Sequence, residues 1–253
     1  MSVGPVRRIR IPLLPQAWRT VTFVHWRYDS RALQPTLPRG LTVQERDGSA
    51  WISLTALHMR DLRPAGPNWM PRWPAFAETN LRTYVQDPSG REGIWFYSLD
   101  AASTAVTYGA RLMLGLPYAR ASAGIDAGDG QDVAYWGVRA ASAGARYRLR
   151  IRPGAPVPPD DLGIWLTHRW RAYTQHLGCL LEIPVRHGPW PLQAAEITTL
   201  EQSLTTAAGL PDPRGQALVH YSCGVADVVF GAPRPVRRTA RRRAAKRQGA
   251  FPL

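Results

Sequence analysis

The dominant pattern along this chain is an alternation of polar and apolar residues with a period of two. Runs of this kind are rich in β-branched and aromatic residues, and each predicts a β-strand. They lie at residues 21–28, 78–86, 91–100, 118–125, 132–140, 145–152, 180–185, 194–200 and 217–230. Twenty-three prolines and 22 glycines are spread among them, which suits short strands joined by turns. The pattern predicts a mainly β domain.

Helical patterns are few. Ser103 is a plausible N-cap for a helix over residues 103–114, and prolines followed by Asp160 predict the start of a second helix over 158–176. Short helical turns are expected after Asp29 and over residues 204–208.

Two turn sequences predict hairpins. Asp47-Gly48 is expected to join strands over 41–46 and 50–59. The four residues 87–90, Asp-Pro-Ser-Gly, fit a type I turn after the strand that ends at Gln86. The segment between the hairpins, 60–77, is rich in proline and tryptophan, and we expect a long loop there, over the surface or over a pocket mouth.

The strand after this loop has an unusual polar face. Because side chains alternate across a strand, Glu78, Asn80, Arg82 and Tyr84 share one face. The opposite face consists of threonine, leucine and valine, which is ordinary core material. The polar face could line a small-molecule pocket, or it could be a solvated strand surface whose charge pair contributes little to stability.

The register of the hairpin decides which residues face this polar row. If a four-residue turn sets the pairing, Glu78 lies opposite Leu99, Asn80 opposite Tyr97, and Arg82 opposite Trp95. A register shifted by one residue would bring Ser98, Phe96 and Ile94 there instead. The first pairing predicts a pocket wall of aromatic rings beside the polar row.

The net charge is unevenly distributed. Eight of the 32 basic residues and none of the 18 acidic residues lie from Arg234 onward, so this tail carries more than half of the net charge of +14. Its like charges and few apolar residues predict disorder. Residues 234–247 could contact nucleic acid or an anionic surface weakly, or the tail could be a solvated terminus without a partner.

Other chemistry is sparse in the sequence. Cys179 and Cys223 form no Cys-x-x-Cys pair, and we expect both to be buried thiols. The six histidines lack the spacing of a metal site, so no metal and no cofactor is expected. With no signal peptide pattern and no apolar run as long as a transmembrane segment, the expected location is the cytoplasm.

Several segments together resemble the YqjF-like family, also named domain of unknown function 2071. They are TFVHW (22–26), LPRGL (37–41), ETNLRTYV (78–85), WFYSLDA (95–101), AR (110–111), LPY (116–118), LTHRW (166–170), HGPWPL (187–192) and HYSCGV (220–225). One departure is His168, where the family pattern has an acid. The resemblance implies a mainly β (α+β), antiparallel, barrel-like fold of the acetoacetate decarboxylase-like superfamily, with a few peripheral helices.

The resemblance also implies domain bounds and candidate chemistry. It gives an N-terminal arm at 1–16, a YqjF-like domain at 17–232 and the basic tail at 233–253. The superfamily's decarboxylases use a Schiff-base lysine, but the one lysine here is Lys246 in the tail. That leaves acid/base and electrostatic chemistry on a small oxo acid or other carbonyl compound.

The candidate site residues follow from the polar face and its predicted neighbours. The catalytic candidates are Glu78, Arg82 and Asn80, and the substrate-binding candidates are Tyr84, Trp95, Tyr97, Arg111 and His25. Trp69, Trp73 and Trp190 are candidates near a pocket mouth. Three functions stay open: a lyase, dehydratase or isomerase without a Schiff base; a noncatalytic binding module; and a protein that contacts nucleic acid or an anionic surface through its tail. A homo-oligomer is compatible with each.

Overall fold

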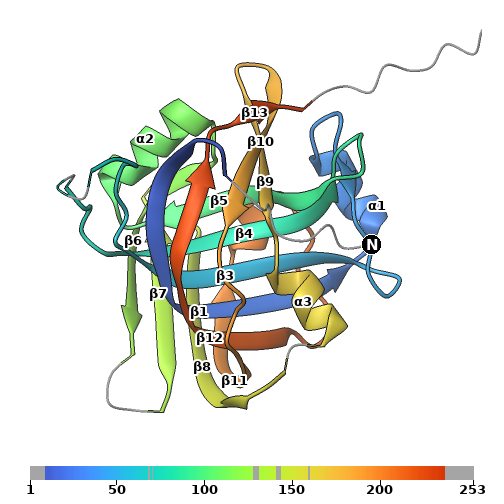
Figure 1. Ribbon diagram of the computed structural model, residues 1–253. Coiled ribbons are helices and arrows are strands. Elements are labelled where there is room, and N and C mark those ends of the chain that lie inside the picture. Colours follow the sequence, from blue (N-terminus) through green and yellow to red (C-terminus); the bar gives the residue numbers. More distant parts are fainter. Residues whose placement is uncertain are drawn as a thin grey trace, which may run out of the picture.

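One strongly bent sheet forms the body of the molecule (Figure 1). The computed structural model describes residues 9–67, 69, 71–127, 131–140, 144–158 and 160–236. Its strands are β1 (Pro12–Tyr28), β2 (Thr42–Val43), β3 (Ala50–Arg60), β4 (Phe76–Gln86), β5 (Glu92–Ala101), β6 (Tyr118–Asp126), β7 (Val133–Arg139), β8 (Arg146–Pro156), β9 (Arg171–His176), β10 (Cys179–Arg186), β11 (Leu192–Gln202), β12 (Leu218–Gly231) and β13 (Arg234–Pro235). The helices are α1 (Ser30–Leu33), η1 (Gln34–Thr36), α2 (Thr104–Leu114), α3 (Asp161–Thr167) and α4 (Leu204–Ala207).

The sheet curls until strands that are distant in its order meet. The order is β13-β10-β9-β5-β6-β7-β8-β11-β12-β1-β3-β4-β2, and β4 also pairs with β5 while β10 pairs with β12. Most neighbours are antiparallel, and β5 runs parallel to both β6 and β9. The result is a partly ring-like sheet, and the prediction of a mainly β fold with a few peripheral helices is confirmed.

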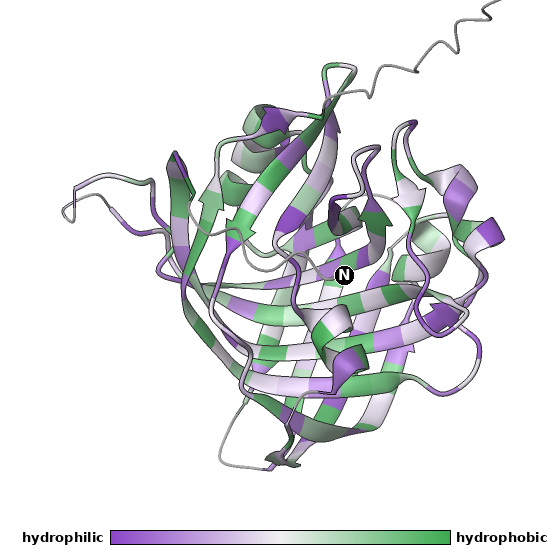
Figure 2. Ribbon diagram, turned by 45° about the vertical axis from the view of Figure 1, so that its right-hand side comes forward, coloured by the Kyte–Doolittle hydropathy of each residue, from purple (hydrophilic) through white to green (hydrophobic). Residues whose placement is uncertain are grey.

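Strand β4 lies between two hydrophobic cores. Ten of its 11 residues are buried, so neither face meets solvent. Leu81 packs in a core with residues of β1, β3, β7 and β8, whereas Tyr84 packs on the opposite side with Phe23 and Trp190. Hydrophobic and hydrophilic residues follow one another along most other strands (Figure 2), as expected where one face is solvated. The polar face of β4 is therefore an internal surface.

The hairpin of β4 and β5 has a different register from the predicted one. Gln86 pairs with Glu92, and Arg82 pairs with Phe96. The connection is longer than a four-residue turn because Gly90 adopts φ +78° and Asp87 still pairs with the carbonyl of Arg91. A bulge between Leu81 and Arg82 then shifts the pairing once more. Glu78 consequently lies opposite Ala101 and Asn80 opposite Leu99.

The second predicted helix is wrong beyond its first two turns. Helix α3 begins after Asp160, whose side chain accepts from the backbone N–H of Gly163 at 2.6 Å, as an N-cap does. It ends at Thr167, and the next residues form β9, which pairs with β10. Leu177 and Gly178 both adopt positive φ, so they make a tight hairpin turn where we expected a helix end. Helix α2, by contrast, matches the prediction, with Ser103 as N-cap.

The hairpin predicted around Asp47-Gly48 is also mostly wrong. The turn exists, with both residues at positive φ and an isolated bridge between Arg46 and Ser49. Strand β2, however, pairs with β4, and β3 pairs with β1. The two cysteines differ from expectation as well, since Cys179 and Cys223 are exposed.

The ordered sheet extends beyond both predicted domain bounds. Strand β1 begins at Pro12, inside the expected arm, and Arg234 and Pro235 at the start of the expected tail pair with Glu182 and Leu181 of β10. Residues 1–8 and the remainder of the tail, 237–253, lie outside the described residues. No helix in the described part of the chain is long and apolar enough to cross a membrane.

Candidate functional site

A cavity of about 80 Å³ lies against the polar face of β4, between β1, β3, β5 and α2. Most of its lining side chains are apolar. The polar ones are Gln16, Thr55, Glu78, Asn80, Arg82, Tyr118, Thr167, Arg169 and His187. The structure therefore brings all three predicted catalytic residues into one cavity. A mostly apolar wall with a few convergent polar groups is typical of small-molecule sites.

Glu78 is a buried carboxyl at one end of this polar row. Only 4% of the residue is exposed, and its Oε2 accepts a hydrogen bond of 2.9 Å from the hydroxyl of Tyr118. The pKa of Glu78 is raised from 4.5 to about 7, chiefly by burial. The hydrogen bond from Tyr118 lowers this pKa, and the charge of Asp100 raises it. A group with this pKa can accept and release protons at neutral pH.

The hydrogen bond from Tyr118 predicts how Glu78 titrates. Because the hydroxyl stabilises the ionised carboxylate, Tyr118→Phe should raise the pKa of Glu78 above about 7, by roughly one pH unit or more. Carbon-13 NMR of the Glu78 carboxyl during a pH titration measures this. Tyr108→Phe, at an exposed position on α2, is the matched control and should leave the titration unchanged. An unchanged pKa in Tyr118→Phe would show that the hydroxyl does not favour the ionised form.

Arg82 is a buried cation without a counter-ion in the described part of the chain. The residue is 8% exposed, and its Nε and Nη2 have no hydrogen-bond partner there. None of the ion pairs among the described residues includes it. Its guanidinium carbon lies 5.6 Å from the centre of the Phe23 ring. Burial lowers the pKa of Arg82, yet a guanidinium stays charged. An unpaired buried charge is costly, and an anionic group in the cavity could pair with it.

Arg169 is a second buried arginine at the cavity, which the sequence did not reveal. Its Nη1 donates to Oε2 of Glu92 at 3.1 Å, while Nε and Nη2 have no partner in the described residues. Its guanidinium carbon lies 4.3 Å from the Trp165 ring centre and 5.0 Å from that of Tyr84. Burial lowers the pKa of Arg169 to about 10, and the charge of nearby Arg82 contributes. Both guanidinium groups stay charged at neutral pH.

Asn80 and His187 add neutral polar groups to the same wall. The Oδ1 of Asn80 is buried and has no partner among the described residues. The Nδ1 of His187 lies 2.6 Å from the carbonyl oxygen of Gly188 and must donate to it, which leaves Nε2 as an acceptor. Burial lowers the pKa of His187 to about 4, so the ring is neutral at pH 7. His187 also went unrecognised as a site residue in the sequence.

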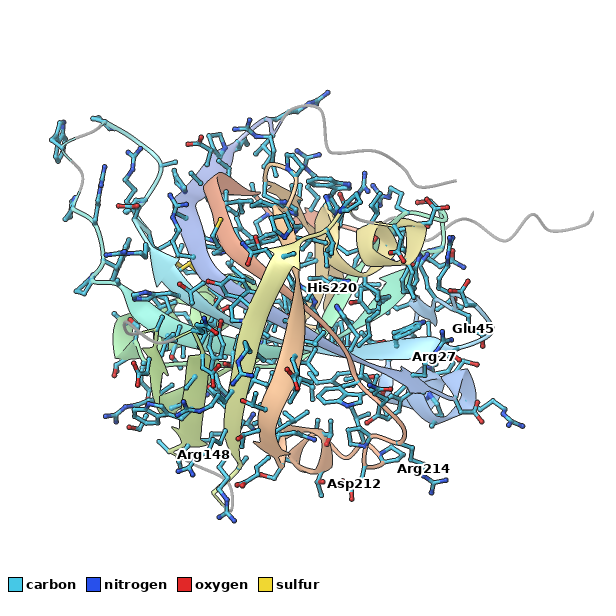
Figure 3. The ribbon with its side chains drawn as sticks, turned by 90° about the horizontal axis from the view of Figure 1, so that it is seen from below. Arg27, Glu45, Arg148, Asp212, Arg214 and His220 are labelled. Atoms are coloured by element: carbon cyan, nitrogen blue, oxygen red, sulfur yellow. The ribbon has the colours of Figure 1, made fainter. Side chains whose placement is uncertain are left out.

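Two predicted binding residues lie behind the cavity wall. Tyr84 shares the face of Arg82 as predicted, but its hydroxyl donates to the carbonyl of Leu166 at 2.8 Å. His25 is fully buried, with Nδ1 3.3 Å from that hydroxyl. Its other neighbour, His220, lies beside α3 on the underside of the molecule (Figure 3). Tyr84 and His25 therefore support the wall without lining the cavity.

Three other predicted binding residues lie elsewhere. The shifted register directs Phe96 into the cavity in place of Trp95 and Tyr97. The Tyr97 hydroxyl instead lies 2.7 Å from Oγ1 of Thr36 on the other side of the strand. Arg111 is exposed on α2 because the inward positions of that helix are apolar. None of these three residues lines the cavity, so the structure does not bring them together with the predicted catalytic residues.

The three tryptophans predicted near a pocket mouth lie in different surroundings. Trp190 lines the cavity, Trp73 packs against the core around it, and Trp69 is 79% exposed. Within residues 9–236, gaps excepted, no three histidine, cysteine, aspartate or glutamate side chains gather as a metal site would require. His168 is half-buried, with its ring centre 6.3 Å from that of His187.

Comparison with known proteins shows which family the chain resembles. The YqjF protein of Bacillus subtilis strain 168, itself described as uncharacterized, is 35% identical over 213 residues, which cover 83% of this chain and 87% of that protein. Among solved structures, acetoacetate decarboxylase from Legionella pneumophila superposes with a TM-score of 0.65 at 12% identity, covering 93% of both chains.

A further structural neighbour has been solved with a ligand. The enduracididine biosynthesis enzyme MppR, complexed with the condensation product of pyruvate and imidazole 4-carboxaldehyde, has a TM-score of 0.59 at 12% identity, covering 93% of this chain and 98% of that one. At such identities these likenesses show a shared acetoacetate decarboxylase-like fold. The family model for the uncharacterized conserved proteins of domain of unknown function 2071 matches residues 15–226. The chain belongs to this DUF2071, YqjF-like family.

Proposed function

We propose that this protein is an enzyme that binds a small oxo acid, or another small carbonyl compound, and moves a proton on it without a Schiff base. The observation that carries this proposal is the presence of Glu78 and Arg82 in one buried cavity, one with a pKa of about 7 and the other without a counter-ion in the described residues. A lyase, dehydratase or isomerase needs this combination of an anion site and a proton carrier.

Each polar group has a role in such a reaction. The guanidinium of Arg82 binds the carboxylate of the substrate through two parallel hydrogen bonds. Asn80 lies between Arg82 and Glu78 on the same strand face, so its side-chain NH₂ group can donate to the carbonyl oxygen as negative charge develops there. Glu78 removes a proton from the carbon next to that carbonyl and returns it to the product. These steps require acid/base catalysis and positioning only.

The lysine content excludes the Schiff-base reaction from the described domain. The chain has one lysine, Lys246, which lies outside the described residues. No lysine can therefore come from β4 or its neighbours to attack a carbonyl carbon. The structural neighbour MppR has also been solved in complex with pyruvate, which supports an oxo acid as the class of compound that this fold accommodates.

A noncatalytic binding module is the second candidate, favoured by the predominantly apolar lining of the cavity. The predicted contact of residues 234–247 with nucleic acid or an anionic surface stays a prediction, because most of that segment lies outside the described residues. It is tested by deleting residues 237–253, which should abolish any salt-sensitive binding of single-stranded DNA. The cytoplasmic location and a homo-oligomer also stay predictions.

Ligand-induced stabilisation tests the proposed function directly. Pyruvate at 100 times its dissociation constant should stabilise the protein by about 2.7 kcal/mol, which raises the melting temperature by roughly 5–10 °C for a chain of this size. Acetone, which has the carbonyl but lacks the carboxylate, should have little effect. Proton NMR in D₂O then detects catalysis as exchange of the methyl protons of pyruvate. Absence of stabilisation by a panel of oxo acids would refute the proposal.

A further inference from the structure

The two arginines of the cavity lie at one end, and the apolar face of helix α2 lies at the other, beside Glu78 and Tyr118. Arg82 and Arg169 meet near Tyr84, which contacts Arg169 and follows Arg82 by two residues on the same face. Glu78 lies four residues earlier along β4, a distance of roughly 13 Å between Cα atoms. It is hydrogen-bonded to Tyr118, the first residue of β6 after helix α2. The cavity therefore extends from an arginine end toward the end covered by α2.

Helix α2 closes the second end with an apolar surface. Val106, Ala110 and Leu114 are spaced four residues apart, so they share one helix face, and all three line the cavity. Leu62 and Leu116 line it as well. Figure 1 shows α2 at the edge of the sheet beside β6. Nothing polar on this face of α2 could bind a charged group, so this end suits a hydrocarbon tail.

The charges at the arginine end fit one anionic group. Glu92 compensates Arg169 at 3.1 Å, and Glu78, with a pKa of about 7, is only partly ionised at neutral pH. Arg82 is the charge without a partner in the described residues. A ligand with one carboxylate balances this charge, whereas a neutral ligand leaves the buried nitrogen atoms of Arg82 unpaired, which is costly.

The cavity volume limits the length of the tail. A water molecule needs about 10–15 Å³ of such space, so 80 Å³ holds roughly five to eight non-hydrogen atoms. A carboxylate and a carbonyl use five of them. The space that is left accommodates a tail of at most about three carbon atoms.

We infer that the substrate class is a straight-chain 2-oxo acid of three to five carbons, with its carboxylate on Arg82 and Arg169 and its tail against α2, where Ala110 sets the accepted length. This inference rests on the proposed function and narrows it. Ala110 is the smallest of the three side chains on the inner face of α2. A larger side chain at position 110 would fill the space that the end of the ligand tail occupies.

A series of 2-oxo acids tests the length limit by isothermal titration calorimetry. From pyruvate to 2-oxobutanoate and 2-oxopentanoate, each added methylene group should tighten binding about fourfold, because it leaves water for an apolar wall. The affinity should fall for 2-oxohexanoate and 2-oxooctanoate, which exceed the available volume. Propanol and butanol, which lack the carboxylate, should not bind measurably at the same concentrations.

Two changes on one helix test the role of Ala110. Ala110→Leu adds three carbon atoms to the wall and should weaken 2-oxopentanoate binding at least tenfold while pyruvate binding stays within about twofold. Ala105→Leu, at an exposed position of the same helix, should leave the whole series unchanged. If Ala110→Leu does not fold, Leu114→Ala provides the converse test, because it enlarges the same end and should move the preference to longer acids.

The outcomes separate the inference from the proposed function. If pyruvate binds but affinity does not change with chain length, or if Ala110→Leu weakens every acid equally, the inference is overturned and the proposed function stands. If no member of the series binds, the proposed function fails as well. A preference that rises to 2-oxopentanoate and shortens in Ala110→Leu supports both.

Discussion

Replacement of Arg82 by methionine is expected to weaken carboxylate binding severely. Arg82 is 8% exposed and has no counter-ion among the described residues, so a bound carboxylate would be its partner. Removing one member of such a buried charged pair costs about 2–5 kcal/mol, which weakens binding roughly 30-fold to several thousandfold. Titration calorimetry with pyruvate measures this. Methionine is unbranched and apolar, so it replaces the aliphatic stem of Arg82 and removes only the charged end.

A second arginine provides the matched control for this experiment. Arg148 lies on the exposed side of β8, away from the cavity (Figure 3), and Arg148→Met removes the same charge without affecting binding. The stability of Arg82→Met is informative too. An unpaired buried charge destabilises the folded protein, so the ligand-free variant should melt at the wild-type temperature or higher. Unchanged pyruvate affinity in Arg82→Met would show that the anion binds elsewhere.

Period-two alternation was sufficient to predict the central part of the site. It assigns Glu78, Asn80 and Arg82 to one face of one strand, and all three line the cavity. The alternation could not show that both faces of β4 are buried. That depends on β1, β3, β7 and β8, which supply the second core from distant parts of the sequence.

The β5 residues predicted to lie opposite Glu78, Asn80 and Arg82 were wrong for a local reason. A type I turn was recognisable from the sequence between Gln86 and Arg91, but Gly90 at positive φ adds a residue to the connection. The bulge after Leu81 has no marker in the sequence. Each displacement changes which side chain of β5 points inward, which is why Phe96 lines the cavity and the residues on either side of it do not.

Arg169 and His187 were beyond the reach of pattern analysis. Arg169 follows Arg82 by 87 residues and lies in the connection between α3 and β9. The prolines and Asp160 before α3 predict a helix that continues through this connection. His187 comes directly after β10 and is held by stacking on Trp170, with ring centres 4.5 Å apart. Such positions depend on tertiary contacts, which a local pattern does not contain.

Replacement of Glu78 by glutamine is expected to abolish catalysis while preserving binding. Glutamine retains the size of the side chain and can still accept from Tyr118, but it cannot move a proton. General acid/base catalysis contributes about 10²–10⁴-fold to a rate, so exchange of the pyruvate methyl protons in D₂O should slow by that factor. The dissociation constant of pyruvate should change less than about threefold. Glu201→Gln, at an exposed position of β11, should exchange protons at the wild-type rate.

The pH dependence of stability tests whether the Glu78 carboxyl, which Glu78→Gln removes, is the group with the raised pKa. In the folded protein the pKa of Glu78 is about 7, against an ordinary value of 4.5, so the folded state binds more protons between these pH values. Stability therefore falls as pH rises from about 4.5 to 7, by at most about 3 kcal/mol. Glu78→Gln should lack this decline and be the more stable protein at pH 8 in thermal denaturation.

These two measurements together decide between catalysis and binding. Loss of proton exchange with retained pyruvate affinity and the expected gain of stability at pH 8 would identify Glu78 as the proton carrier. Wild-type exchange rates in Glu78→Gln would exclude that role, and a cavity that binds pyruvate without Glu78-dependent exchange would then fit a noncatalytic binding module. Loss of both binding and stability would instead mean that the carboxyl maintains the cavity itself, which the raised pKa argues against, because burial disfavours its charged form.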